Sequence, residues 1–297
     1  MNFELLRIVI ALVGTAVLAY QDHKTSFVDE KIIYAMIVVG ILLDILTLDS
    51  QFILFAIGGA AIIGIIGYYL YKTGQFGLGD SLLFVGLHAL LPFPAVEIAR
   101  HINATPLVQI EHYATISQVI PFILSIAVTA SVLALVGSSV GYAYSIYKNK
   151  KMWQPNKLIL AISTIAAVTF IAWFQLSASL SILQLITIAI ICAASIFAVS
   201  TKEQVMRDII VKQLRISQIE DEDILAIENI DKKLVKQYKL EKVLTQSEVE
   251  KLKSIQKNTG RKLFPVYKNL PRFIPYVLVS LVIHLLYLNA IAFFIFL

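Results

Sequence analysis

Two aspartates, Asp22 and Asp80, stand where apolar runs of the chain meet polar sequence. Asp22 follows the first apolar run, Leu5 to Tyr20, and Asp80 heads the apolar run from Ser81 to Pro92. Acids at a lipid boundary are costly, so the first hypothesis for them is a functional one. Two carboxylates held close together cannot both ionise easily, so one keeps its proton. The ionised partner can then deprotonate an attacking water while the protonated partner polarises a carbonyl. The pair predicts hydrolysis at a bilayer surface.

The acid at position 80 is preceded by Gly77, Leu78 and Gly79. Glycine can adopt positive φ and lets other groups approach the backbone closely, so we expect an open backbone next to the acid. A helix that begins here would also present free amides and its positive dipole end to Asp80. The competing interpretations are that Asp80 is only a helix cap and that Asp22 is a solvated acid at a helix end. The pairing of the two favours chemistry.

The composition is that of a membrane protein with one soluble insert. Of the 297 residues, 58% are hydrophobic and 15% are charged, whereas about a quarter are charged in a typical soluble domain. The net charge of +5 comes without a basic patch that contains interleaved aromatic residues, so we expect no nucleic-acid partner. The single cysteine, Cys192, excludes an internal disulfide and a paired-cysteine zinc site. We expect neither a metal nor an organic cofactor.

Eight stretches are candidates for crossing a bilayer, which takes about 20 mostly apolar residues. They are 4–21, 31–48, 52–72, 80–99, 119–147, 157–176, 180–200 and 273–297. No small-residue cleavage site follows the first stretch, so we expect a retained helix. Arg7 in its outer turns is interpreted as snorkelling to the lipid boundary. The predicted fold class is all-α, a polytopic integral membrane protein with about eight transmembrane helices and a small helical cytoplasmic insert.

Between residues 201 and 272 the composition changes to Lys, Glu, Asp and Gln with periodic Ile, Leu and Val. We interpret this block as a small, mostly helical soluble domain whose last helix ends at Gly260. The predicted organisation is a transmembrane helical core with the Asp pair (1–200), the cytoplasmic domain (201–272) and a C-terminal transmembrane helix (273–297).

The distribution of Lys and Arg between the spans predicts the orientation. In the short connections and span ends, one side carries Lys24, Lys31, Lys72, Lys148, Lys150, Lys151 and Lys157, and the other carries only Arg7 and Arg100. Basic residues are enriched in cytoplasmic loops. We therefore expect both termini outside, and Asp22, Asp80 and the 201–272 domain on the cytoplasmic side of the cell membrane.

The chain resembles the archaeal preflagellin and type IV prepilin peptidases, which are aspartic proteases of the membrane with a Gly-x-Gly-Asp motif. The resemblance lies in Tyr20-Gln21-Asp22-His23-Lys24, in Val28-Asp29 and in Gly77-Leu78-Gly79-Asp80. Weaker similarity lies in residues 244–253 and in Pro271-Arg272-Phe273-Ile274-Pro275. The middle of the chain, about 100 to 200, carries no matching motif, and its spans 157–176 and 180–200 exceed the six that the family leads us to expect.

The resemblance implies that Asp22 and Asp80 are the two catalytic acids. It implies substrates that are flagellin- or pilin-like precursors, from which short basic leader peptides are cut just before a hydrophobic helix at the cytoplasmic face. The single cysteine favours an archaeal-type enzyme without the paired-cysteine segment and the methyltransferase activity of many bacterial members. Which precursors are cut, and the oligomeric state, stay open.

Two other function classes compete with this interpretation. One is a secondary transporter in which Asp22, Asp44 and Asp80 bind cations, which requires acids near the bilayer midplane. The other is a non-enzymatic assembly factor that acts through the insert. Within the enzyme hypothesis, the acidic run from Glu220 to Asp223 is a candidate for gripping basic leaders. His88 is interpreted as a polar contact between helices.

Overall fold

The computed structural model describes residues 4–26, 28–48, 50–73, 76–92, 122–178, 181–219, 223–268 and 270–287. Of the described residues, 78% are helical, and five of the described helices are long and apolar enough to cross a membrane. This confirms the predicted polytopic, helical membrane fold. The helices of the apolar part are α1 (Glu4–Thr25), α2 (Glu30–Ile45), α3 (Ser50–Lys72), α4 (Leu78–Leu90), α7 (Phe122–Lys148), α8 (Lys157–Ala178), α9 (Ile182–Ser200) and α13 (Ile274–Tyr287).

Each of these helices overlaps one of the eight predicted spans, but three of them are short. Helices α2, α4 and α13 have 16, 13 and 14 residues, whereas a full crossing takes about 20. Parts of the expected spans 80–99, 119–147 and 273–297 lie outside the described residues, as does the expected outer loop around 100–118. The five long helices are α1, α3, α7, α8 and α9.

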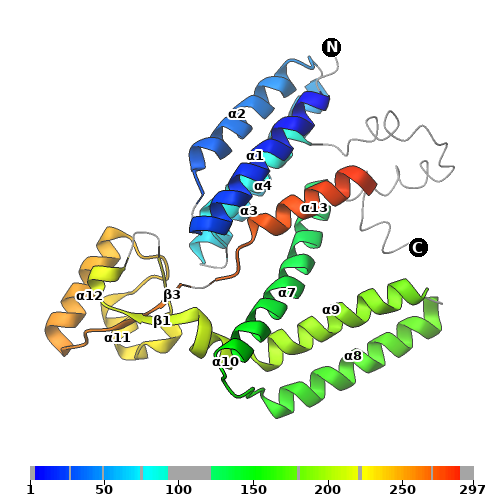
Figure 1. Cartoon of the computed structure of the whole chain (residues 1–297). Helices are drawn as coiled ribbons and strands as arrows, with labels where there is room; N and C mark the ends of the chain where they lie inside the picture. Colours follow the sequence, from blue (N-terminus) through cyan, green and yellow to red (C-terminus); the bar gives the residue numbers. More distant parts are fainter. Residues whose placement is uncertain are drawn as a thin grey trace.

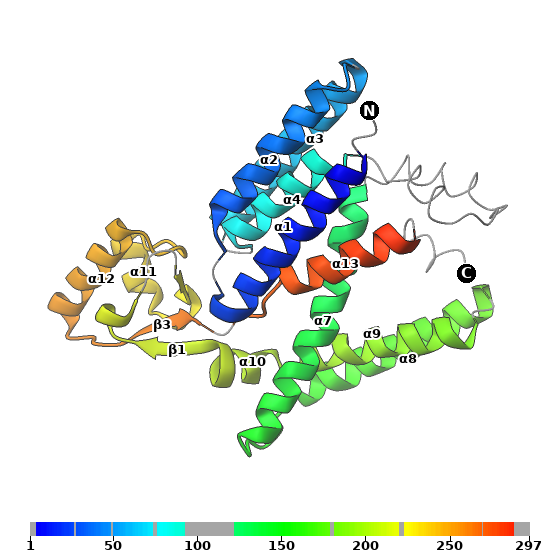
Figure 2. The same ribbon diagram turned by 45° about the horizontal axis from the view of Figure 1, so that its top comes forward.

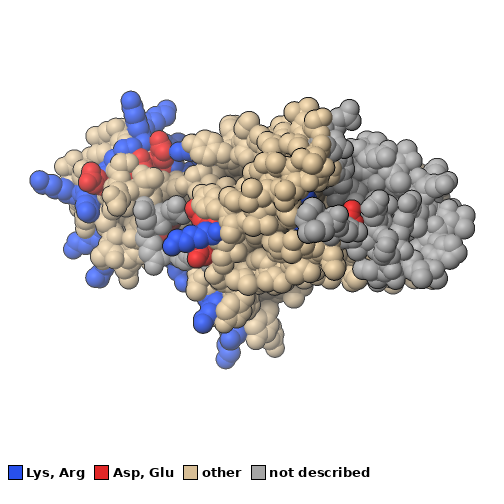
Figure 3. All heavy atoms as spheres, turned by 90° about the horizontal axis from the view of Figure 1, so that it is seen from above, with Lys and Arg blue, Asp and Glu red and all other residues tan. Residues whose placement is uncertain are grey.

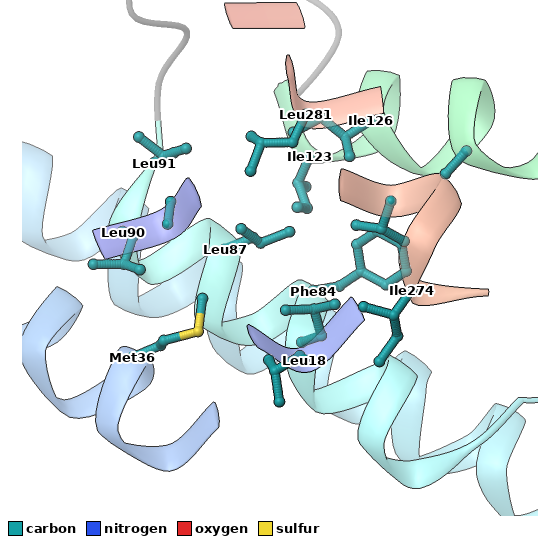
Figure 4. Close-up of a cluster of buried hydrophobic side chains, with 14 of the residues drawn as sticks. Leu18, Met36, Phe84, Leu87, Leu90, Leu91, Ile123, Ile126, Ile274 and Leu281 are labelled. Atoms are coloured by element: carbon teal, nitrogen blue, oxygen red, sulfur yellow. The ribbon is translucent and has the colours of Figure 1, made fainter. Parts of the chain in front are cut away.

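Helix α4 lies at the centre of the helical core. It packs against α2, α3 and α1 and touches α7, and it runs alongside the first three helices (Figures 1 and 2). Its side chains meet those of α1, α2, α7 and α13 in one buried cluster, in which Leu87 and Leu90 are fully buried. Figure 4 shows Leu18, Met36, Leu87, Ile126 and Ile274 converging there from five helices. A helix that is apolar on nearly every face is expected in such a position.

Helices α8 and α9 form a hairpin beside this core. Helix α9 packs against α7, and α8 packs against α9. No residue in the apolar window of α8 is buried, and the pair extends away from α1–α4 in both ribbon views (Figures 1 and 2). The two additional spans therefore lie outside the bundle that carries Asp22 and Asp80.

The insert combines helices with a small sheet. Its elements are α10 (Lys202–Val205), a π-helical turn (Met206–Ile210), β1 (Val211–Leu214), β2 (Ile224–Leu225), α11 (Lys232–Tyr238), α12 (Gln246–Thr259) and β3 (Phe264–Tyr267). The strand order is β1-β3-β2, and both pairings are antiparallel. The expected helices are present, and the sheet is an addition that the sequence did not indicate, because its strands have only four, two and four residues.

The insert has its own apolar core. Leu225, Leu244, Leu252 and Phe264 are fully buried in it. Gly260 ends α12 with a φ of +73°, as predicted, because glycine adopts this left-handed conformation at little cost. Seen from above, charged side chains gather at the end of the molecule that the insert forms, and the surface over the middle is mostly uncharged (Figure 3).

Candidate active site

Asp22 lies in the last turn of α1 and points into the protein. Its side chain is 8% exposed, and its Oδ2 accepts a hydrogen bond from the backbone N–H of Ile274, at 3.2 Å. Ile274 begins α13, so the amide end of that helix faces the carboxylate, where a negative charge is favoured. The positive charge of Arg272 also acts on Asp22. The start of the last helix therefore holds the first acid in place.

Asp80 lies in the first turn of α4, three residues after the cap residue Gly77. Its carboxylate accepts a hydrogen bond from the backbone of Gly77, and its charge interacts with that of Asp22. The two acids thus meet at one end of the core, although 58 positions separate them in the sequence. In the part of the chain that the structure describes, they are brought together by the packing of α1 and α13 beside α4.

Of the two properties of glycine considered for this motif, the structure shows close approach and not positive φ. Gly77 has an ordinary extended conformation, with φ −69° and ψ 149°, so positive φ is not needed. What both positions require is space: a Cβ at Gly79 would lie 2.4 Å from Cγ2 of Val28, and one at Gly77 would lie 3.0 Å from Oδ2 of Asp80. Carbon atoms that are not bonded to each other do not approach to 2.4 Å. Gly79 therefore lets the start of α4 lie directly against the segment that leads into α2.

Asp22 and Asp80 line one cavity of about 190 Å³. Its other lining residues are Ser26, Val28, Glu30, Tyr71, Phe76, Gly77, Leu78, Gly79, Ile224, Val243 and Ile274. All three motif residues before Asp80 are thus part of the cavity wall. Three carboxylates lie among the lining residues, and no Lys or Arg does. The cavity therefore combines an acid pair with a negative lining.

Eight of the thirteen lining residues were not among the predicted site residues, and these include Glu30, Ile224, Val243 and Ile274. Ile274 was noted only within the weaker similarity at Pro271 to Pro275, and Glu30 was not singled out as a site residue. Ile224 and Val243 come from the insert, about 200 positions after Asp22. No local pattern marks them, because their place in the cavity depends on how the insert folds against the helices.

Asp44 lies at the other end of the core and is not part of this cavity. It is fully buried, and its Oδ1 accepts a hydrogen bond from Nη1 of Arg7, at 2.6 Å. The same guanidinium donates to the carbonyls of Ala89 and Leu90, each at 3.3 Å, where α4 ends before Pro92. The expectation that Arg7 snorkels is wrong, because its charge is neutralised by Asp44 and by the free carbonyls of α4.

Other predicted residues have mainly packing contacts. His88 in α4 is buried and packs against Phe55, with ring centroids 6.0 Å apart, and against Gly59 in α3. It is thus an interhelical contact, as expected. Asp223 pairs with Lys268 at 2.9 Å. The rest of the acidic run, residues 220–222, lies outside the described residues.

Comparison with known families gives one match. Residues 9–139 match the model of the type IV leader peptidase family, a range that contains Asp22, the segment from Gly77 to Asp80, most of α1, and α2 to α4. No curated protein and no solved structure matches the chain. The match agrees with the resemblance seen in the motifs around the two acids. The N-terminal helical region is therefore similar to the type IV leader peptidase family, and this match supports the assignment to prepilin and preflagellin peptidases.

Proposed function

We propose that this chain is an aspartic endopeptidase of the membrane that removes short basic leader peptides from preflagellin- or prepilin-like precursors at the cytoplasmic face. The observation that carries the proposal is that Asp22 and Asp80 line the same cavity and interact electrostatically. In this proposal Asp22 and Asp80 are the catalytic residues, and Gly77, Leu78 and Gly79 support them.

The two acids take different roles in the proposed reaction. Asp22 accepts a hydrogen bond from the N–H at the start of α13 and lies near Arg272. We therefore assign it the negative charge and the role of general base. Asp80 keeps the shared proton and donates a hydrogen bond to the carbonyl oxygen of the scissile peptide. The water oxygen bonds to the carbonyl carbon as Asp22 takes a proton from the water, and Asp22 then passes this proton to the leaving amine as the C–N bond breaks.

The lining of the cavity suits a basic substrate. Its charged members are Asp22, Glu30 and Asp80, with no Lys or Arg beside them among the described lining residues. Carboxylates in a site partly shielded from water attract cationic side chains more strongly than they would in bulk water. A leader rich in Lys or Arg matches this lining, and an acidic one would be repelled.

The test compares full-length variants in membranes with a model precursor that joins a lysine-rich leader to an apolar helix. We expect Asp22→Asn and Asp80→Asn each to lower the cleavage rate by about 100-fold or more, because each removes a proton-transfer group. Asp29→Asn is the matched control: Asp29 caps α2 through Lys31 N–H, at 3.0 Å, and Asn caps a helix equally well. Full activity of either site variant refutes the assignment.

The transporter alternative has less support. It places Asp22, Asp44 and Asp80 at a common cation site near the bilayer midplane. The structure pairs Asp44 with Arg7 instead, and Arg7 precedes Asp22 by 15 residues of α1, which is about 22 Å along a helix. The third acid is therefore neutralised and remote from the other two.

A further inference from the structure

The insert forms one wall of the cavity that holds the two acids. Eleven of the thirteen lining residues belong to α1, α3, α4, α13 and the segments 26–30 and 76–77, and the other two, Ile224 and Val243, belong to the insert. Both are aliphatic and only partly buried. They face Glu30 and the acid pair across the same space.

Backbone pairing fixes the direction of these two side chains. Ile224 and Val243 oppose each other in an antiparallel bridge, flanked by hydrogen bonds from Leu225 N–H to Lys242 O at 2.7 Å and from Leu244 N–H to Asp223 O at 2.8 Å. Successive side chains of extended backbone point to opposite faces. Leu225 and Leu244 are fully buried in the insert core, so Ile224 and Val243 are presented on the opposite face, toward the cavity.

The same sheet is joined to α13, the helix whose first backbone N–H donates a hydrogen bond to Asp22. Ile224 pairs with Tyr267 in β3, and seven residues after Tyr267 the chain reaches Ile274, whose N–H bonds to Asp22. The segment from Tyr267 to Ile274 therefore positions both Ile224 in the cavity wall and the carboxylate of Asp22. A cavity of about 190 Å³ is smaller than a typical ligand pocket of roughly 300–1,000 Å³, so it accommodates the few groups around one peptide bond.

We propose that Ile224 and Val243 form an apolar subsite that takes an aliphatic or aromatic side chain of the substrate next to the cleaved bond. This inference rests on the proposed function. The cavity then sorts substrates by polarity: cationic groups of the leader lie toward the carboxylates on the helices, and the first apolar residues after the cleaved bond lie against the insert. The insert is thereby a specificity element.

The first test measures selectivity with two model precursors that share a lysine-rich leader and differ only in the residue after the cleaved bond, Leu or Ser. Val243→Thr keeps the shape of the side chain and adds a hydroxyl to the wall. We expect it to lower the Leu-over-Ser ratio of kcat/KM by about tenfold, which is the usual effect of one changed group in an apolar pocket. Leu263→Ala is the control, because Leu263 belongs to the insert, is 44% exposed and lies outside the cavity lining.

The second test does not require cleavage. In the Asp80→Asn background, the only native cysteine, Cys192, is replaced by Ser, and Val243→Cys or Leu263→Cys is added. A precursor with a cysteine directly after the cleavage site should form a disulfide with the Val243→Cys variant and not with the Leu263→Cys variant. Equal cross-linking of both, or an unchanged Leu-over-Ser ratio in Val243→Thr, overturns the subsite. Full cleavage by Asp22→Asn or Asp80→Asn overturns the proposed function instead.

Discussion

The two ends of the helical core bury acids in opposite ways. At one end, Asp44 is fully buried, and its carboxylate is matched by Arg7. At the other, Asp22 and Asp80 interact unfavourably with each other and line a cavity. Both ends involve the same three helices, α1, α2 and α4, and at each end the two interacting charged groups come from different helices.

This difference separates a structural acid from candidate catalytic ones. A buried charge is tolerated when a partner and hydrogen bonds satisfy it, as the guanidinium of Arg7 does for Asp44 and for the last carbonyls of α4. Two adjacent carboxylates beside an open space have no such structural benefit. Ionisable groups with such unfavourable interactions are concentrated at functional sites.

The largest expected effect on stability is at the Arg7–Asp44 end. Arg7→Leu or Asp44→Leu leaves one buried charge unpaired, so we expect each to lower the free energy of unfolding by about 3–5 kcal/mol. The double variant should lose less than either single variant, because it leaves no unpaired charge. Thermal unfolding of the detergent-solubilised protein measures this.

The same variants sharpen the comparison when the cleavage rate per folded molecule is measured. Because Arg7 and Asp44 lie far from the cavity, the double variant should cleave at close to the wild-type rate. A double variant that is folded and inactive would contradict the separation of the two ends.

A smaller effect is expected where α3 meets α4. A Cβ at Gly59 would lie 2.2 Å from Nε2 of the buried His88, whereas a Cβ at Gly58 would meet nothing within 4 Å. Gly59→Ala should therefore cost about 1–3 kcal/mol of stability through overpacking. It should also slow cleavage, because α4 carries Asp80. Gly58→Ala is the matched control and should be neutral or slightly stabilising, as judged by thermal unfolding; equal effects of the two would contradict this packing.

The smallest effect is expected in the insert, where Tyr267 donates a hydrogen bond to Glu228. Burial pushes the pKa of Glu228 up, but the hydrogen bond from Tyr267 and nearby lysines outweigh it, so this pKa lies below its usual value of 4.5. A lowered carboxyl pKa stabilises the fold above about pH 4.5 and ceases to do so as the pH falls through the folded-state pKa.

Tyr267→Phe should therefore destabilise the protein slightly at pH 7, by less than about 1 kcal/mol because Glu228 is exposed to solvent. The difference from wild type should shrink as the pH is lowered below 4. Thermal unfolding of the full-length protein across this pH range checks the prediction. Glu228→Gln removes the titrating group, so its difference from wild type should also shrink below about pH 4. A difference that grows on acidification would contradict it.

Much of the helical arrangement is readable from composition, because a long apolar run has few alternatives in a bilayer. Each described apolar helix overlaps a predicted span, and Gly260 ends α12 as its sequence context indicates. The short strands of the insert were missed, because runs of two to four residues carry too little alternation to be distinguished from loops. Close approach at Gly79 was expected, but the residue that approaches, Val28, was not named because it is distant in sequence.

The sequence by itself determined the helical membrane class and the two acids worth testing, since apolar length, the Gly-x-Gly-Asp pattern and unpaired charge are all local features. Only the tertiary structure decided which acids meet. It joined Asp22 to Asp80 and Asp44 to Arg7, and it brought Ile224 and Val243 to the cavity. The physical reason is that such contacts depend on helix packing and on the register of a small sheet, which no single stretch of sequence encodes.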